Sequence, residues 1–290
     1  MIRIDAHAHL WKKQQGTVNG QPVYALSGGR SSFLGEVRQM MPPFMLNGEN
    51  TAEMLISNMD YAGVWGAVIT QEEMDGNQDA YLLSAKKKYP DRLRICSLYR
   101  EGEPFLLKGF DGVKICACRL QTQDLTKHAA VFEAAAKADK FVSIDLADGD
   151  LQTGSLEEMI RAYPDLRVAI GHFGMVTREG WLSQIALAQY KNVFIESGGI
   201  TWLFNEEFYP YPSAVAAIRE AASHVGFHKL MWGSDYPRTM VEITYKMSYD
   251  FLEKSDALTD AEKRLFLGEN AMAFYRFDKA EEIIPPKHML

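Results

Sequence analysis

The chain has 290 residues, of which 47% are hydrophobic and 24% charged, and its formal net charge is −7. These proportions are typical of one large globular domain or two small ones, with enough buried surface to fold without disulfides. The acidic balance argues against nucleic acid or an anionic membrane as a partner. The sequence has no run of 18 apolar residues and no signal segment, so we expect a cytoplasmic protein without a membrane span.

Short β-branched or aromatic runs alternate along the chain with longer segments of helical period. The pattern predicts eight strands, at residues 2–6, 65–70, 93–98, 112–116, 141–146, 167–172, 193–197 and 230–234. It predicts helices at residues 51–62, 77–89, 125–138, 155–163, 178–190, 213–225 and 259–274. Thr51 and Thr259 each precede an acidic residue by two or three positions, as helix N-caps do.

This alternation predicts an α/β fold, a single-domain (β/α)8 barrel of eight parallel strands, over residues 1–277, followed by a tail at 278–290. The alternative is an open doubly wound sheet, but no glycine-rich phosphate loop follows the first strand. Two connections are unusual: 11–50 is a long loop without clean periodicity, and 201–212 is dense in aromatic residues. Both follow strands, so we expect both at the C-terminal face, where barrels build active sites.

Metal-competent side chains stand at the ends of three predicted strands. His7 and His9 end the first strand, and their spacing of two places both imidazoles on one face. His172 ends the sixth strand and Asp235 ends the eighth. Each alone could be an ordinary core or turn residue, but the barrel brings all four to one rim. Sets of histidine and aspartate with an open position suit a catalytic metal, so we predict all four as ligands.

The three cysteines, Cys96, Cys116 and Cys118, form no Cys-x-x-Cys pair. They lie in or beside apolar runs, as buried thiols do. We therefore expect reduced cysteines rather than a disulfide or a thiolate metal site.

The strand-end motifs resemble those of a known family. His-x-His at the first strand, Gly-His-x-Gly at the sixth and Gly-Ser-Asp-x-Pro at the eighth are similar to the amidohydrolase superfamily, nearest to the lactonase-like members of its amidohydrolase-related (amidohydrolase 2) branch. The resemblance extends over residues 1–277. It implies a distorted (β/α)8 barrel with one divalent metal, with zinc preferred, manganese as the alternative and a metal-independent variant also open. Family members include lactonases and non-oxidative decarboxylases of aromatic acids.

The chain departs from this family at the fifth strand, where metal-dependent members carry a histidine. Asp145 and Asp148 stand there instead, and either could supply a ligand or a substrate contact. By resemblance, His172 is a catalytic or substrate-binding group, and with the usual ligand missing it could also bind the ion. Lys114, at the end of the fourth strand, would bind a substrate carboxylate or polarise a lactone carbonyl rather than bridge two ions.

Other residues near strand ends are weaker candidates. Arg100 follows the third strand and is a second candidate for contact with an anionic substrate, and Trp202 in the aromatic loop is a candidate substrate contact. Glu72 and Glu73 follow the second strand, where each is either a metal ligand or, as we rather expect, a solvated loop acid. Glu196 lies inside the seventh strand, where a buried acid needs a partner, so we expect it to support the site electrostatically.

These inferences predict a hydrolase that opens a lactone, or a related ester or amide, of a small polar acid. Asp235 would be the general base, and Lys114 or His172 would stabilise the oxyanion. The alternative is a metal-dependent decarboxylase of an aromatic or unsaturated acid, which the aromatic loop favours and the missing histidine disfavours. A non-catalytic binding protein on the same barrel is a third hypothesis. A homodimer could form through the aromatic loop and the tail.

Overall fold

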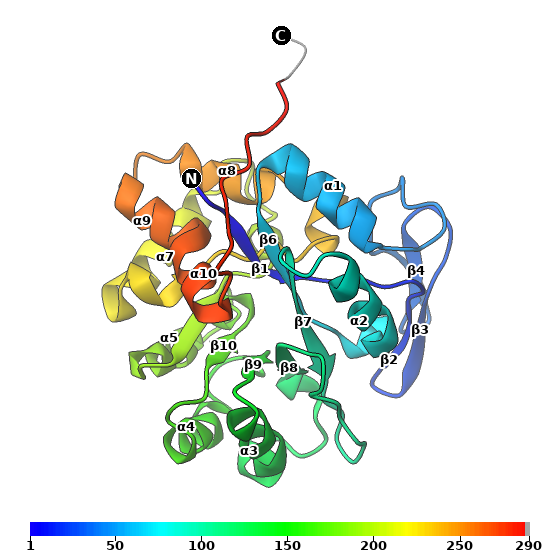
Figure 1. Ribbon diagram of the computed structural model, residues 1–290, viewed down its shortest axis with the longest axis vertical. Helices are drawn as coiled ribbons and strands as arrows, with labels where there is room; N and C mark the ends of the chain where they lie inside the picture. Colours follow the sequence, from blue (N-terminus) through cyan, green and yellow to red (C-terminus); the bar gives the residue numbers. More distant parts are fainter. Residues whose placement is uncertain (288–290) are drawn as a thin grey trace.

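Eight parallel strands form the centre of the molecule (Figure 1). The structure, a computed structural model, describes residues 1–287. Each strand of this sheet pairs with the next in the order β1-β6-β7-β8-β9-β10-β11-β12. Their bounds are β1 Ile4–Ala8, β6 Gly66–Ile69, β7 Leu93–Leu98, β8 Gly112–Ile115, β9 Phe141–Ile144, β10 Val168–Ile170, β11 Val193–Glu196 and β12 Leu230–Met231.

The first and last strands also meet, so the sheet closes into a barrel. The backbone N–H of Ala6 donates to the carbonyl of Trp232 at 2.9 Å, and the N–H of Asp235 donates to the carbonyl of His7 at 2.9 Å. The predicted (β/α)8 barrel is therefore confirmed, and the open sheet is excluded. The eighth strand is shorter than predicted because the chain leaves the ladder after Met231 and turns Asp235 into a left-handed conformation with φ 57°.

Helices follow most of the strands and pack their apolar faces on the outside of the barrel. Their bounds are α1 Ala52–Ala62, α2 Asp79–Lys88, α3 Ala129–Lys137, α4 Thr153–Ala162, α5 Trp181–Ala186, α6 Ile200–Leu203, α7 Pro212–Val225, α8 Met247–Glu253, α9 Asp260–Arg264 and α10 Asn270–Tyr275. The hydroxyl of Thr51 caps α1, and Thr259 forms a capping box with Glu262, as predicted. The predicted helix 259–274 contains a π-helical segment between α9 and α10, and α8 was not predicted.

Residues 11–50 are not the structureless loop that we predicted. They contain a four-stranded antiparallel sheet, the inserted sheet, with β2 Gln15–Val18, β3 Gln21–Ala25, β4 Arg30–Phe33 and β5 Glu36–Gln39 (blue in Figure 1). Its strands have four or five residues and are largely exposed, so they lack the apolar alternation that marks a strand in a sequence. β2 packs against the 3₁₀ turn Glu73–Asp75, which follows the C-terminal end of β6.

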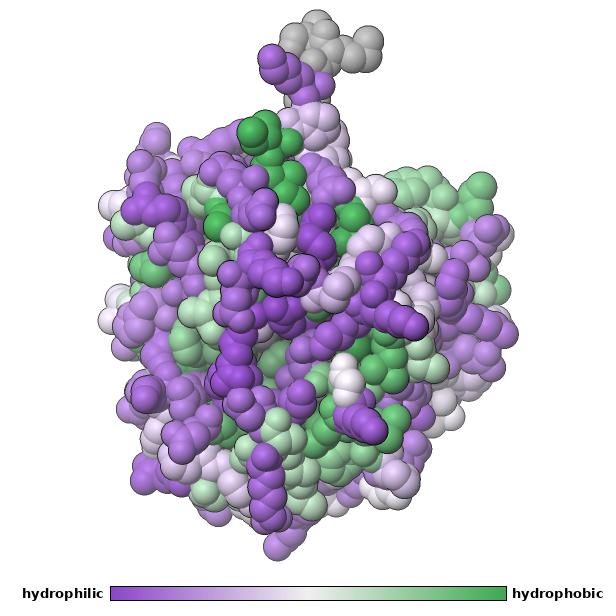
Figure 2. All heavy atoms as spheres, in the orientation of Figure 1, coloured by the Kyte–Doolittle hydropathy of each residue, from purple (hydrophilic) through white to green (hydrophobic). Residues whose placement is uncertain are grey.

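The surface seen in Figure 2 is mostly hydrophilic, with scattered apolar patches. Among residues 1–287, no helix has both the length and the apolar character that a bilayer span requires. The predicted tail lies within the described chain as far as residue 287 and forms no helix or strand there, whereas residues 288–290 lie outside the described residues.

Candidate active site

The side chains of His7, His9 and Asp235 converge at the C-terminal end of the barrel. His7 lies in β1, His9 follows it, and Asp235 follows β12. His7 Nε2 lies 3.1 Å from His9 Nε2, which lies 2.9 Å from Asp235 Oδ1, and the third side of this triangle, from His7 Nε2 to Asp235 Oδ1, is 3.9 Å. All three residues are at most 2% exposed. The three atoms therefore form a compact donor set with little access to solvent.

This donor set suits a metal ion. A tetrahedral ion bound at about 2.0–2.2 Å needs ligand atoms about 3.3 Å apart, and the observed separations bracket that value. Glu196 Oε1 lies 2.7 Å from His7 Nδ1, and a carboxylate oxygen there accepts from an Nδ1–H, the tautomer of His7 that leaves a lone pair on Nε2. Burial and the charge of Arg238 lower the pKa of His9 to about 4, which keeps its ring neutral at pH 7. These residues could therefore hold a divalent metal.

A second group of charged side chains lies beside the first. Lys114 Nζ lies 2.6 Å from Asp145 Oδ2, and His172 Nε2 lies 3.5 Å from the same oxygen. Burial lowers the pKa of His172, but the charge of Asp145 and a hydrogen bond to it raise that pKa to about 10. Burial raises the pKa of Asp145, but Lys114 and His172 hold it well below its usual value. His172 is therefore an imidazolium paired with a carboxylate at neutral pH.

Both ring nitrogens of His172 have oxygen partners, because Nδ1 also donates to the carbonyl of Gly198 at 2.9 Å. His172 does belong to a second set of possible metal ligands, with His7 and Asp145, whose atoms lie within 4.8 Å of one another. An imidazolium with two acceptors nevertheless has the arrangement of a hydrogen-bond donor rather than of a ligand. Gly171, which precedes it, has no space for a side chain, since a Cβ there would lie 2.1 Å from Asp145 Oδ1.

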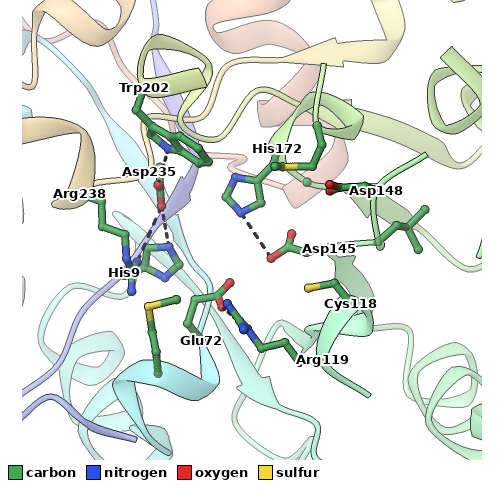
Figure 3. A pocket seen from close by; sticks show the side chains of 14 residues that line it. His9, Glu72, Cys118, Arg119, Asp145, Asp148, His172, Trp202, Asp235 and Arg238 are labelled. Atoms are coloured by element: carbon green, nitrogen blue, oxygen red, sulfur yellow. Dashed lines mark hydrogen bonds and ion pairs between the residues drawn. The ribbon is translucent and has the colours of Figure 1, made fainter. Parts of the chain in front are cut away.

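A cavity of about 230 Å³ opens in front of these two groups (Figure 3). It is lined by His9, Glu72, Met74, Cys118, Arg119, Asp145, Leu146, Asp148, Gly171, His172, Met175, Trp202, Asp235 and Arg238. The indole N–H of Trp202 donates to Asp235 Oδ2 at 2.8 Å, so Trp202 is both a wall of the cavity and a partner of the acid. Burial and the nearby Asp145 raise the pKa of Glu72 to about 7.

The sequence profile of the amidohydrolase family matches residues 4–277, almost the whole chain. The chain belongs to the amidohydrolase family. The resemblance inferred from the three strand-end motifs is thereby confirmed. No curated protein matches the sequence.

Solved structures show the same fold at low sequence identity. One is a crystal structure of a probable 2-pyrone-4,6-dicarboxylic acid hydrolase from Acinetobacter baumannii with citric acid bound, at 21% identity and a TM-score of 0.71, covering 95% of this chain and 100% of that one. Another is an amidohydrolase from Burkholderia multivorans with bound zinc, at 14% identity and a TM-score of 0.69. The match covers 95% of this chain and 99% of that one. A third is 5-carboxyvanillate decarboxylase from Novosphingobium aromaticivorans with manganese, at 17% identity and a TM-score of 0.55. The match covers 77% of this chain and 79% of that one.

The amidohydrolase barrel brings most of the predicted site residues together, but not all of them reach the cavity. Lys114 is fully buried beneath Asp145 and is not a lining residue. Arg100 lines two neighbouring hollows, between the barrel and the inserted sheet, rather than this cavity. Asp148 lines the cavity as an exposed side chain.

Sequence reasoning missed two cationic residues of the cavity wall, Arg119 and Arg238. Arg238 comes directly after the motif Gly-Ser-Asp-x-Pro, so a cation beside a predicted ligand was a visible signal. Arg119 follows the fourth strand by four residues and is brought to the cavity by a 3₁₀ turn, Ala117–Arg119, that no pattern in the sequence predicts.

Proposed function

We propose that this amidohydrolase opens the ring of a small polar lactone, or cleaves a related ester or amide. The proposal rests on one observation: His7, His9 and Asp235 bring three donor atoms together, and His9 and Asp235 line a cavity that the protonated His172 also lines. Three protein ligands with an open side are typical of catalytic zinc sites. The similar structure named as a probable dicarboxylic acid hydrolase supports a hydrolytic reaction.

We infer that zinc is the ion, because two imidazoles and one carboxylate in a compact triangle match its preferred ligands. Manganese is the alternative. A divalent ion bound by His7, His9 and Asp235 would polarise a carbonyl and lower the pKa of a water molecule. Glu196 would orient the His7 ring from behind, because it accepts the proton of Nδ1.

Asp235 is arranged to act as a base. Burial raises its pKa, but the hydrogen bond to His9 and the charges of Arg238 and His172 hold the pKa below its usual value. Ionised Asp235 would take a proton from the water that attacks the acyl carbon. It would return that proton to the ring oxygen as the acyl C–O bond breaks, which yields a hydroxy acid. His172 Nε2, whose contact with Asp145 Oδ2 is long at 3.5 Å, would donate a hydrogen bond to the carbonyl oxygen as negative charge develops on it.

The substitution Asp235→Asn tests this assignment. It keeps the shape of the side chain but removes the base, so we expect kcat to fall at least ~10²-fold on whichever lactone of a screening panel is hydrolysed. Asp148→Asn is the matched control, since Asp148 lines the same cavity but is exposed and pairs with Arg178. Near-wild-type turnover of Asp235→Asn would contradict the assignment, provided that its thermal unfolding shows a folded protein.

Decarboxylation is the second candidate, because one of the similar structures is a decarboxylase that binds manganese. It predicts release of CO₂ from hydroxybenzoate-like acids and no hydrolysis of lactones. If the protein turns over neither class and yet shows thermal shifts with members of the panel, the binding-protein hypothesis is favoured instead.

A further inference from the structure

Arg238 is a largely buried cation of the cavity wall to which the proposed reaction assigns no contact with the substrate. It lies in a 3₁₀ turn after β12, and its side chain is 15% exposed. In Figure 3 it lies beside His9 and Asp235, with its guanidinium at the edge of the cavity. The guanidinium carbon lies 5.7 Å from the centre of the Trp11 ring, a cation–π contact. A buried arginine so close to a candidate metal ligand needs an explanation.

One side of the guanidinium is anchored. Arg238 Nη2 donates to Asp75 Oδ2 at 2.7 Å. Asp75 is itself held, because the side-chain amide of Gln14 donates to its other oxygen at 2.9 Å. The hydroxyl of Ser31 in turn donates to the side-chain oxygen Oε1 of Gln14 at 2.5 Å. Asp75, Gln14 and Ser31 are each at most 2% exposed. A chain of buried hydrogen bonds therefore runs from β4 of the inserted sheet to Arg238.

The other side of the guanidinium makes no hydrogen bond and has only a long ion pair, with Asp235. Arg238 Nη1 is buried, has no hydrogen-bond partner and lies 3.8 Å from Asp235 Oδ1. Leaving a buried charged donor unsatisfied is unfavourable, and an arginine with a purely structural role would use both ends of its fork. A cationic N–H that makes no hydrogen bond and lies beside the cavity is suited to an anionic oxygen that arrives with a ligand.

The inserted sheet is docked closely enough to fix this chain of bonds. A Cβ on Gly16 of β2 would lie 2.0 Å from the carbonyl oxygen of Glu73, in the turn that carries Asp75. A Cβ on Gly76, after that turn, would lie 2.1 Å from the carbonyl oxygen of Gln15. Only glycine permits this backbone contact, so the two segments act as one support.

We propose that Arg238 binds an anionic oxygen of the ligand through Nη1, and that Asp75 and Gln14 are positioning residues through which the inserted sheet sets the place of that guanidinium. In the proposed hydrolase, the oxygen is the one that gains negative charge at the scissile carbonyl and keeps it in the product carboxylate. That last identification rests on the proposed function, whereas the binding of an anion by Arg238 does not. The inserted sheet is then part of the active site although none of its strands lines the cavity.

Calorimetric titration with citrate tests anion binding without any turnover. We expect citrate to bind the wild-type protein and to bind Arg238→Met ~10- to 100-fold more weakly, the range of a charge-assisted hydrogen bond. Arg238→Lys keeps the charge but cannot span Asp75 and the ligand, so intermediate affinity is expected. Wild-type affinity in Arg238→Met, or no binding of citrate to the wild-type protein, would overturn the proposal.

Variants along the chain of hydrogen bonds test the positioning. Gln14→Leu removes a hydrogen bond from a neutral amide to Asp75, and we expect ~2- to 10-fold weaker citrate binding. Asp75→Asn should weaken binding further, and Asp75→Glu should restore part of it. The control is Gln39→Ala, which alters β5 of the same sheet but not the chain of bonds, since Gln39 donates to the carbonyls of Gly28 and Met41. Equal citrate affinity in Gln14→Leu, Asp75→Asn and Gln39→Ala would overturn the positioning role.

Discussion

Trp202 decides which oxygen of Asp235 faces the other ligands. Its indole N–H occupies Oδ2, so Oδ1 is left to His9. The ring is tightly placed, because a Cβ on Gly199 would lie 1.7 Å from Trp202 Nε1, and its centre lies 6.0 Å from that of His172. Trp202 was predicted from the sequence as a substrate contact, and the structure adds this hydrogen bond to its surroundings.

The substitution Trp202→Phe separates the two contributions of this side chain. It keeps an aromatic wall but removes the N–H, so Asp235 loses a charge-assisted bond and can rotate. We expect kcat to fall ~10-fold or more with little change in KM, because such bonds contribute ~1.5–3 kcal/mol. Steady-state kinetics on the identified substrate measures the split, with Trp202→Ala, which also removes the wall, expected to raise KM. A rise in KM alone in Trp202→Phe would show that the ring, and not its N–H, matters.

The convergence of His7, His9, His172 and Asp235 could be predicted from the sequence because each ends a strand, and the C-terminal ends of barrel strands share one rim. The contacts of the Lys114 side chain could not be predicted. Its position on β8 was correct, but whether a lysine reaches the cavity or turns under a neighbour depends on Asp145, which follows the neighbouring strand β9. The local pattern of apolar and polar residues does not show which side chains from different strands will pair.

Among the secondary-structure elements, the long barrel helices and buried strands were predicted best, because burial on one face produces a periodic sequence. The inserted sheet was missed for the opposite reason. All four residues of β5 are exposed, and β2 has one buried residue, Val18. Short exposed strands carry no period, and the hydrogen bonds that join them leave no trace in the composition.

Docking of the inserted sheet gives a prediction at this scale. Gly16→Ala would force a methyl group against the carbonyl of Glu73, so we expect a loss of ~1–3 kcal/mol in the free energy of unfolding. Hydrogen exchange in β2–β5 should become faster at the same time. Gly154→Ala is the matched control, because a Cβ there, in α4, meets no atom within 4 Å and favours the helix. Equal stability of the two variants in urea unfolding would show that the contact is not tight.

At the scale of the whole molecule, the proposed ligands come from the first and the last strand of the barrel. His7 and His9 belong to β1 and the segment after it, and Asp235 follows β12, so the His9–Asp235 contact joins positions 226 residues apart. A metal bound there would tie the first strand to the last at the seam where the barrel closes. Binding of the ion would then appear as global stability, because the unfolded chain does not hold this triangle together.

Thermal unfolding with and without zinc follows from this arrangement. At a hundredfold excess over Kd, an ion that binds only the folded protein adds ~2.7 kcal/mol, so we expect Tm to rise by several degrees and chelation to reverse the rise. His9→Ala should abolish the shift. His172→Gln should retain it, since both nitrogens of His172 already have oxygen partners. Loss of the shift in His172→Gln would make His172 a ligand, and no shift with zinc or manganese in the wild-type protein would indicate a metal-independent lactonase in which the histidines bind the substrate.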